Sequence, residues 1–324
     1  MKHFSILVTI IALTSAAFIM AGCSKDTTPT GTSQPSVEEQ AIQTSLASSD
    51  YALPMEFHND EQYQDPDVTG EGVEYSVGQN GGETLPWVRF HRIMRLTPRV
   101  EYLIEIPGSE GEGTADVRIV HHLRGTFVVD NTDDHVRNPF FKPFVSAAVT
   151  NVMARRTDDV WRIVKVSPTD IRSVNDGGTT IHIAWVKAEG SSHTFPMSSI
   201  FSPDTLLALH ELPAFAPGDT VRVRARALNT NQSDCWLFLH VHSRHAADAF
   251  HMRVPFARDA SDPTLYRAAW VVPAGIEAPR VFHMAVDGID WNTLFGDETA
   301  IYNSRMWCVP CLIGYPQPGK EWSQ

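Results

Sequence analysis

The stretch ADVRIVHHLRGTFVV, residues 115–129, alternates apolar and polar side chains over most of its length. A period of two is typical of a β-strand with one buried face. Similar patterns recur in four neighbouring segments, at 87–94, 99–106, 144–155 and 160–166. We therefore expect an antiparallel meander, with a turn at 156–159 and with Gly125 marking a bulge.

One helix is expected before this meander. Ser36 and Glu39 form a capping-box pattern, and apolar side chains follow at helical spacing until shortly before Pro54. A helix followed by a curved antiparallel sheet predicts an α+β domain over residues 37–172.

The hairpin that ends in DVWRIVKVSP, residues 159–168, resembles the last hairpin of nuclear-transport-factor-2-like folds. This resemblance implies a cone-shaped sheet with a concave face, as found in binding proteins, enzymes and structural modules of that fold. The side chains that could project into such a pocket are those of His91, Arg92, Tyr102 and His121.

A break in the pattern at 171–178 predicts a boundary, with a second domain over residues 173–324. Short strands then follow at near-regular spacing, at 180–187, 220–228, 235–242, 250–256, 266–272, 280–286 and 300–313. This spacing indicates an immunoglobulin-like β-sandwich, with a short helix at 203–212 and a turn at 286–288. The stretch 293–298, with Tyr302 and Trp307, resembles sandwich domains at the C-termini of uncharacterised bacterial lipoproteins.

The N-terminal sequence predicts the cellular location of the protein. Lys2 precedes an uncharged apolar run, which is typical of a secretory signal peptide over residues 1–22. The run ends in Met20-Ala21-Gly22-Cys23, which resembles a bacterial lipobox and implies acylation of Cys23. Residues 23–36 then read as a flexible tether, and Ser24 resembles the sorting pattern of outer-membrane lipoproteins. We expect a lipid-anchored protein of the bacterial cell envelope, attached to the bilayer by acyl chains on Cys23.

The charge balance narrows the choice of partners. The 324 residues carry 26 Lys and Arg against 38 Asp and Glu, a formal net charge of −12. A nucleic-acid partner is not expected, because phosphate contacts need a basic face. An envelope protein or a glycan remains open as a partner.

Two histidines two residues apart, His240 and His242, point to the same face of a strand. Imidazole pairs suit zinc or copper, and His251 and His283 follow further along the chain. The alternative is a chance pair on an outer face, since the chain contains 14 histidines. No cysteine or carboxylate lies at a ligand spacing in the neighbouring sequence.

Three cysteines remain after Cys23. A disulfide from Cys235 to Cys308 or Cys311 would join two strands of the sandwich. The segment Trp307-Cys308-Val309-Pro310-Cys311 resembles the active-site motif of thioredoxin-like oxidoreductases. No helix can begin after it, so the redox role is not expected here.

No catalytic motif is recognisable, and a non-catalytic binding or scaffold role is the favoured hypothesis. A surface tryptophan, Trp291, is the expected contact residue, because it lies between Asp290 and Asn292 in a turn-like stretch. Two alternatives stay open: a ligand pocket or enzyme site in the cone-like domain, and a metal-binding sandwich that uses the His-x-His strand.

Overall fold

The computed structural model describes residues 34–51, 85–94, 99–107, 113–134, 136, 138–175, 177–190, 198–231, 233–243, 250–276 and 280–314. The chain divides into a short unit, Met1–Ser36, and a second unit that begins at Val37. The expected signal peptide, Cys23 and the first part of the expected tether lie outside the described residues.

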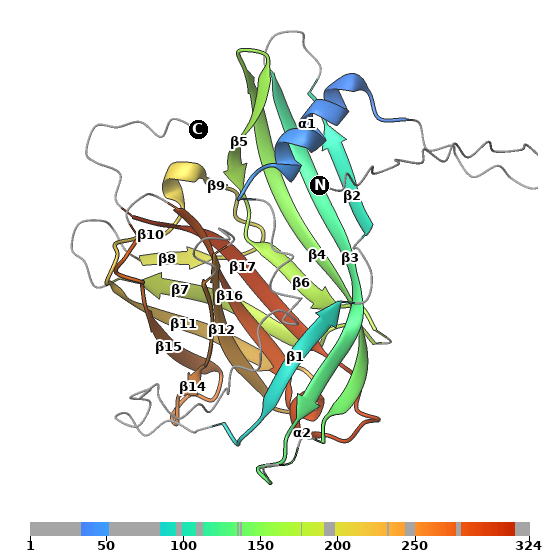
Figure 1. Cartoon of the computed structure of the whole chain (residues 1–324), viewed down its shortest axis with the longest axis vertical. Helices are drawn as coiled ribbons and strands as arrows, with labels where there is room; N and C mark the ends of the chain where they lie inside the picture. Colours follow the sequence, from blue (N-terminus) through green and yellow to red (C-terminus); the bar gives the residue numbers. More distant parts are fainter. Residues whose placement is uncertain are drawn as a thin grey trace, which may run out of the picture. The chain divides into compact units, whose positions relative to one another are not determined.

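The second unit is mostly β-structure and contains two sheets (Figure 1). The strands of the large, 12-stranded sheet are β1 (Arg89–Met94), β2 (Arg99–Glu105), β3 (Thr114–Asp130), β4 (Phe140–Thr157), β5 (Val160–Val166), β6 (Thr169–Ser173), β9 (Leu207–Ala208), β10 (Ala214–Phe215), β12 (Cys235–Ser243), β13 (Phe250–Pro255), β16 (Arg280–Asp290) and β17 (Ser304–Ile313). The strands of the small, five-stranded sheet are β7 (Ile181–Glu189), β8 (Ser198–Phe201), β11 (Thr220–Asn229), β14 (Ala257–Arg258) and β15 (Leu265–Val271). The helices are α1 (Val37–Ala47), α2 (Trp291–Phe295) and a 3-10 turn, η3 (Leu209–Glu211).

The large sheet joins the two halves of the chain. Its main path runs β1-β3-β4-β6-β17-β16-β12-β13, and β6 pairs antiparallel with both β4 and β17. Strands from before and after residue 173 therefore share one hydrogen-bonded sheet. The predicted split into a helix-and-sheet domain and a separate immunoglobulin-like sandwich is not confirmed in that form.

The large sheet curls until its two ends meet. β1 and β13 lie at opposite ends of the strand path, yet Arg253 of β13 donates a hydrogen bond to the carbonyl oxygen of Phe90 in β1, at 2.7 Å. The Phe90 ring also packs edge-on against Phe238 of β12, with ring centres 4.8 Å apart. Such contacts across the curl are possible only because the sheet folds back over one of its own faces. We call this the inner face.

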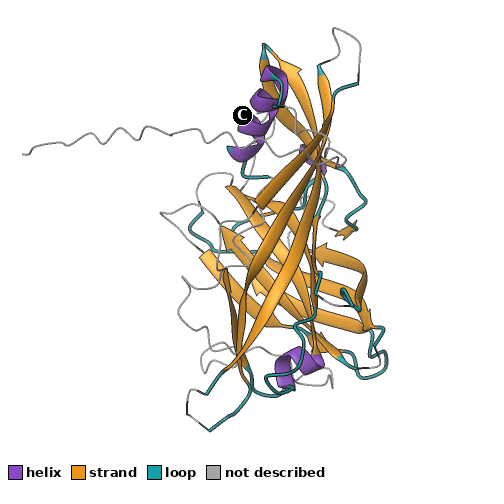
Figure 2. Ribbon diagram, turned by 90° about the vertical axis from the view of Figure 1, so that its right-hand side faces the viewer, coloured by secondary structure: helices purple, strands orange, loops and turns teal. Residues whose placement is uncertain are grey.

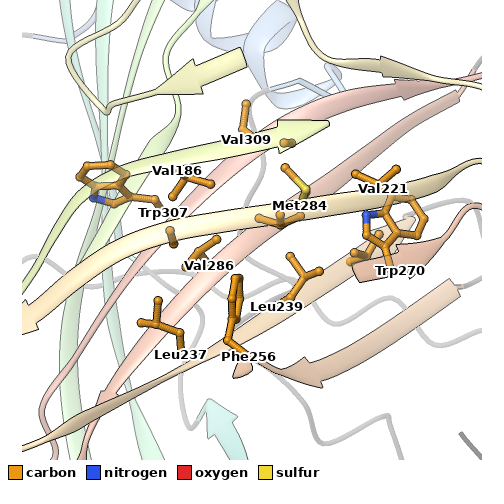
Figure 3. Close-up of a cluster of buried hydrophobic side chains, with 14 of the residues drawn as sticks. Val186, Val221, Leu237, Leu239, Phe256, Trp270, Met284, Val286, Trp307 and Val309 are labelled. Atoms are coloured by element: carbon orange, nitrogen blue, oxygen red, sulfur yellow. The ribbon is translucent and has the colours of Figure 1, made fainter. Parts of the chain in front are cut away.

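The opposite face of β12, β16 and β17 packs against the small sheet. Leu237, Leu239 and Met284 from the large sheet meet Val221 and other apolar side chains from the small sheet in one cluster (Figure 3). The side chains of β11 alternate between this cluster and solvent, as one-sided burial requires. The C-terminal half thus contains a two-sheet sandwich, although one of its layers continues into the N-terminal half.

Helix α1 covers one end of the inner face. Its buried residues, Ile42 and Leu46, pack with Ile119 of β3, Trp161 of β5 and Leu312 of β17. The two α-helices lie near opposite ends of the long strands (Figure 2). In the described residues no helix is long and apolar enough to cross a membrane.

Several local expectations are confirmed and others are wrong. The β4–β5 hairpin turns at Asp158 and Asp159, both in the left-handed region, within the predicted turn. Gly125 marks no bulge, since the register between β3 and β4 runs through it without a shift, and the pairing of β3 with β1 ends at it. It is small because a side chain there would meet the Phe144 ring at 2.6 Å and the backbone of β1. The predicted helix at 203–212 is instead a turn, the short strand β9 and η3.

Candidate functional site on the inner face

A buried ion pair spans the inner face. Nη2 of Arg92 in β1 lies 2.8 Å from Oδ2 of Asp287 in β16, and Nε2 of His240 in β12 lies 3.3 Å from the same oxygen. The side chains of all three are fully buried. Arg92 Nε also donates to the Tyr302 hydroxyl, at 2.8 Å. These contacts tie three strands together across the curl.

The pKa of Asp287 reflects these neighbours. Burial raises the pKa of its carboxyl, but the Arg92 guanidinium and His240 outweigh burial and hold the pKa at about 2. Asp287 is therefore a carboxylate at neutral pH. Because both charged side chains are buried, each depends on the other to offset the cost of its removal from water.

A row of histidines lies beside this pair on the same face. His242 of β12 pairs in register with His251 of β13 on one side and with His283 of β16 on the other. Residues directly opposite each other in antiparallel strands point to the same face, with Cβ atoms about 5 Å apart. We call these three residues the histidine row. His242 and His283 are buried and His251 is half-buried.

Each ring nitrogen of His283 contacts a polar atom outside the histidine row. Its Nε2 lies 2.7 Å from the carbonyl oxygen of Asp50, just after α1, and its Nδ1 lies 3.8 Å from Sγ of Cys308 in β17. A carbonyl oxygen only accepts hydrogen bonds, so Nε2 carries the hydrogen. In the neutral ring Nδ1 is then left with its lone pair directed at the sulfur.

The predicted pair His240 and His242 does share one face, but that face is not an outer one. Both are buried on the inner face, with Trp236 and Phe238 of the same strand. The centre of the His251 ring lies 6.1 Å from that of His240 and 6.2 Å from that of His242. As these side chains stand, no group of three or more His, Cys, Asp or Glu within the described ranges is arranged to hold a metal ion.

The four predicted pocket residues do not converge. His91 points to the opposite face from Arg92, its neighbour in β1. Tyr102 lies on the inner face beside the α1 cluster and is half-buried. Arg92 lies opposite Phe127 of β3, and Phe127 is six residues along that strand from His121. Arg92 and His121 are therefore about 20 Å apart along the strand direction.

His121 is buried, and neither ring nitrogen has a hydrogen-bond partner in the part of the chain that the structure describes. Burial, and to a smaller extent the neighbouring His122, lower its pKa to about 4. At neutral pH His121 is therefore uncharged.

Cys235, Cys308 and Cys311, the cysteines of the described residues, form no disulfide. Cys235 pairs with Asp290 and Cys308 with Ala285, positions about 17 Å apart along β16, which is too far for a bond. Cys235 and Cys311 lie in the apolar cluster against the small sheet, whereas Cys308 lies on the inner face. Burial raises the pKa of Cys235 to about 11 and also raises the pKa of Cys311.

Trp291 is half-buried rather than a free surface contact. It begins α2, stacks on Phe295 with ring centres 4.2 Å apart and lies near Trp236. Lys142 fixes the end of this helix, because its Nζ donates to the carbonyl oxygens of Asn292, Thr293 and Gly296 at 3.0–3.1 Å. Burial lowers the pKa of Lys142 to about 8.

The sequence interpretation did not anticipate the positions of Asp287 and Arg253 or the contact between Cys308 and His283. Asp287 and Gly288 were expected in a turn, but β16 continues through them to Asp290. The spacing of His283 and Asp287 could have indicated that Asp287 belongs to the strand, because residues four positions apart lie on the same face of a strand.

Comparison of the chain with protein-family models, with curated protein sequences and with solved structures gave no match.

Proposed function

We propose that this chain is a lipid-anchored protein of the bacterial cell envelope whose folded body binds a late transition-metal ion, zinc or copper. The anchor is the acylated Cys23, and the metal site is the histidine row. The single observation that carries the metal proposal is the register of β13, β12 and β16, which places His251, His242 and His283 side by side on one face.

The chemistry of the row suits such an ion. Imidazole nitrogen is a preferred ligand of zinc and copper, and three such ligands are typical of a site that keeps one position open. His283 already has the outer contact that metal-binding histidines usually make, because its Nε2 hydrogen is held by the Asp50 carbonyl.

Binding requires the rings to turn. Metal–nitrogen bonds of about 2.0–2.1 Å bring the centres of two ligating rings to about 6 Å or less, somewhat closer than His242 and His251 stand now. Rotation about the side-chain torsions supplies this movement, since the strand register already holds the Cβ atoms close together. We expect the backbone of the three strands to stay in place when the ion binds.

The metal proposal is tested by stoichiometry on untagged protein. After removal of bound metal with a chelator, zinc or copper(I) is titrated and the bound ion is measured by elemental analysis. We expect one ion per chain, and a loss of affinity of at least tenfold in His242→Ala and in His251→Ala.

His182→Ala is the matched control, because His182 is exposed on β7 of the small sheet. It should bind like the wild type. Absence of a stoichiometric ion in the wild type, or equal affinity in all three variants, would refute the metal site.

The anchor is tested separately. Cys23→Ala should abolish incorporation of radiolabelled palmitate and move the protein from the membrane fraction to the soluble fraction. Unchanged membrane association without labelling of the wild type would remove the envelope proposal and leave the metal proposal untouched.

A further inference from the structure

We propose that Cys308 supplies a thiolate to this metal site, which makes it a mixed nitrogen–sulfur centre for zinc or copper(I). This inference rests on the proposed function and extends its ligand set. Of the cysteines in the described ranges, Cys308 is the one on the inner face, where it lies beside His283.

The distance between the two donors fits a shared ion. Tetrahedral zinc, with bonds of about 2.0–2.1 Å to nitrogen and about 2.3 Å to sulfur, sets the two donor atoms about 3.5 Å apart. Sγ of Cys308 and Nδ1 of His283 are 3.8 Å apart. An ion can therefore bridge them with a movement of a few tenths of an ångström.

The direction of the His283 ring is also correct for this role. The Asp50 carbonyl holds the hydrogen on Nε2, so Nδ1 is the nitrogen that can bind a metal or accept the thiol hydrogen. Without metal, the Cys308 thiol donates to Nδ1. When the ion binds, it replaces that hydrogen, both donors bond to the metal, and one proton leaves to solvent.

Thiolate ligation decides which ions the site prefers. Soft sulfur ligands favour copper(I) and zinc, whereas magnesium, calcium and manganese favour oxygen ligands. We expect the site to take the first group and to leave the second in solution.

The alternative is that Cys308 is only a small apolar side chain in the core, a common role for buried cysteine. Cobalt(II) distinguishes the two, because it replaces zinc and shows a sulfur-to-metal charge-transfer band in the near ultraviolet only when a thiolate is bound. We expect this band in the full-length wild type and its loss in Cys308→Ala, together with at least a tenfold weaker affinity for zinc.

Cys311→Ala is the matched control. It removes a buried cysteine from the same strand, three residues away and on the opposite face, so the band and the affinity should both persist. Far-ultraviolet circular dichroism confirms that both variants are folded.

A second measurement uses only the wild type and avoids any folding defect. Bound zinc should slow alkylation of Cys308 at least tenfold more than alkylation of Cys235 and Cys311, as read by peptide mass spectrometry, because stabilisation of the fold slows all three buried thiols but only a metal ligand is also blocked directly. A cobalt spectrum without the sulfur band, or a Cys308 rate that zinc slows no more than the rates of Cys235 and Cys311, overturns the inference. If His242→Ala still loses metal in that case, the proposed function stands and only the thiolate is rejected.

Discussion

The two faces of β12 are both buried, but they meet different surroundings. One face presents Leu237, Leu239 and Val241 to the small sheet, in a cluster that is almost entirely apolar. The other presents His240 and His242 to the inner face of the curled sheet, next to an ion pair. Burial alone therefore does not distinguish a core from a site in this protein. The chemical character of the buried side chains, apolar on one face and polar on the other, distinguishes them.

The two faces also differ in how they stabilise the fold. An apolar side chain on the first face contributes about 1.5–3 kcal/mol through removal of its surface from water. On the second face each charge has been taken out of water at a cost, which is offset only while its partner is present. The inner face is thus far more sensitive to the loss of a single partner.

The largest expected effect is on this inner face. Replacement of Asp287 by Ala leaves the Arg92 guanidinium buried without its carboxylate, and we expect the free energy of unfolding to fall by about 3–5 kcal/mol. Urea denaturation followed by circular dichroism measures the change.

The double variant Arg92→Met/Asp287→Leu checks the physical cause. Because it removes both charges together, it should recover most of the lost stability. If the double variant is as unstable as Asp287→Ala, the packing of these strands, and not the unpaired charge, carries the effect.

The apolar face could be predicted well from the sequence. Its strands follow a local pattern: the predicted strand at 220–228 corresponds to β11, at Thr220–Asn229, and that at 235–242 corresponds to β12, at Cys235–Ser243. The β4–β5 turn is equally local, because two residues set its geometry. These elements depend on neighbours within a few residues.

The inner face could be predicted only in part. The His-x-His spacing places His240 and His242 on one face, but the pairing with His251 and His283 depends on strand register, which no short pattern reveals. Asp287 was expected in a turn because Asp followed by Gly is typical of turns. Asp287 can occupy a buried strand position because Arg92 compensates its charge. Arg92 is 195 positions away in the chain, so no local pattern reveals this pairing.

A smaller, pH-dependent effect is expected at His121, a second buried polar group of the inner face. Its pKa is about 4 in the folded protein against 6.5 for an unperturbed histidine, so between these values the unfolded state binds more protons. Stability should therefore fall as the pH is lowered from about 6.5 to about 4. On the order of 2–3 kcal/mol of this loss should be absent in His121→Leu.

Denaturation curves of metal-free wild type and variant at pH 7 and pH 4 measure this difference. His182→Leu serves as the control for the change from histidine to leucine, because the His182 side chain is exposed on β7 of the small sheet and lies away from His121. Parallel loss of stability in the wild type and in His121→Leu would show that His121 is not buried in the neutral form.

The smallest effect is expected outside both buried faces, at the pair formed by Arg226 of β11 and Asp262. Nη2 of Arg226 lies 2.9 Å from Oδ2 of Asp262, nearly the distance of the Arg92–Asp287 pair, but the two side chains are 47% and 38% exposed. Water and salt screen this pair, and ordering the two side chains offsets part of the attraction. Arg226→Ala should therefore shift the urea midpoint by no more than the error of the measurement. Because the two pairs match in chemistry and in distance, a large loss in Arg226→Ala would show that burial is not what makes the inner face sensitive.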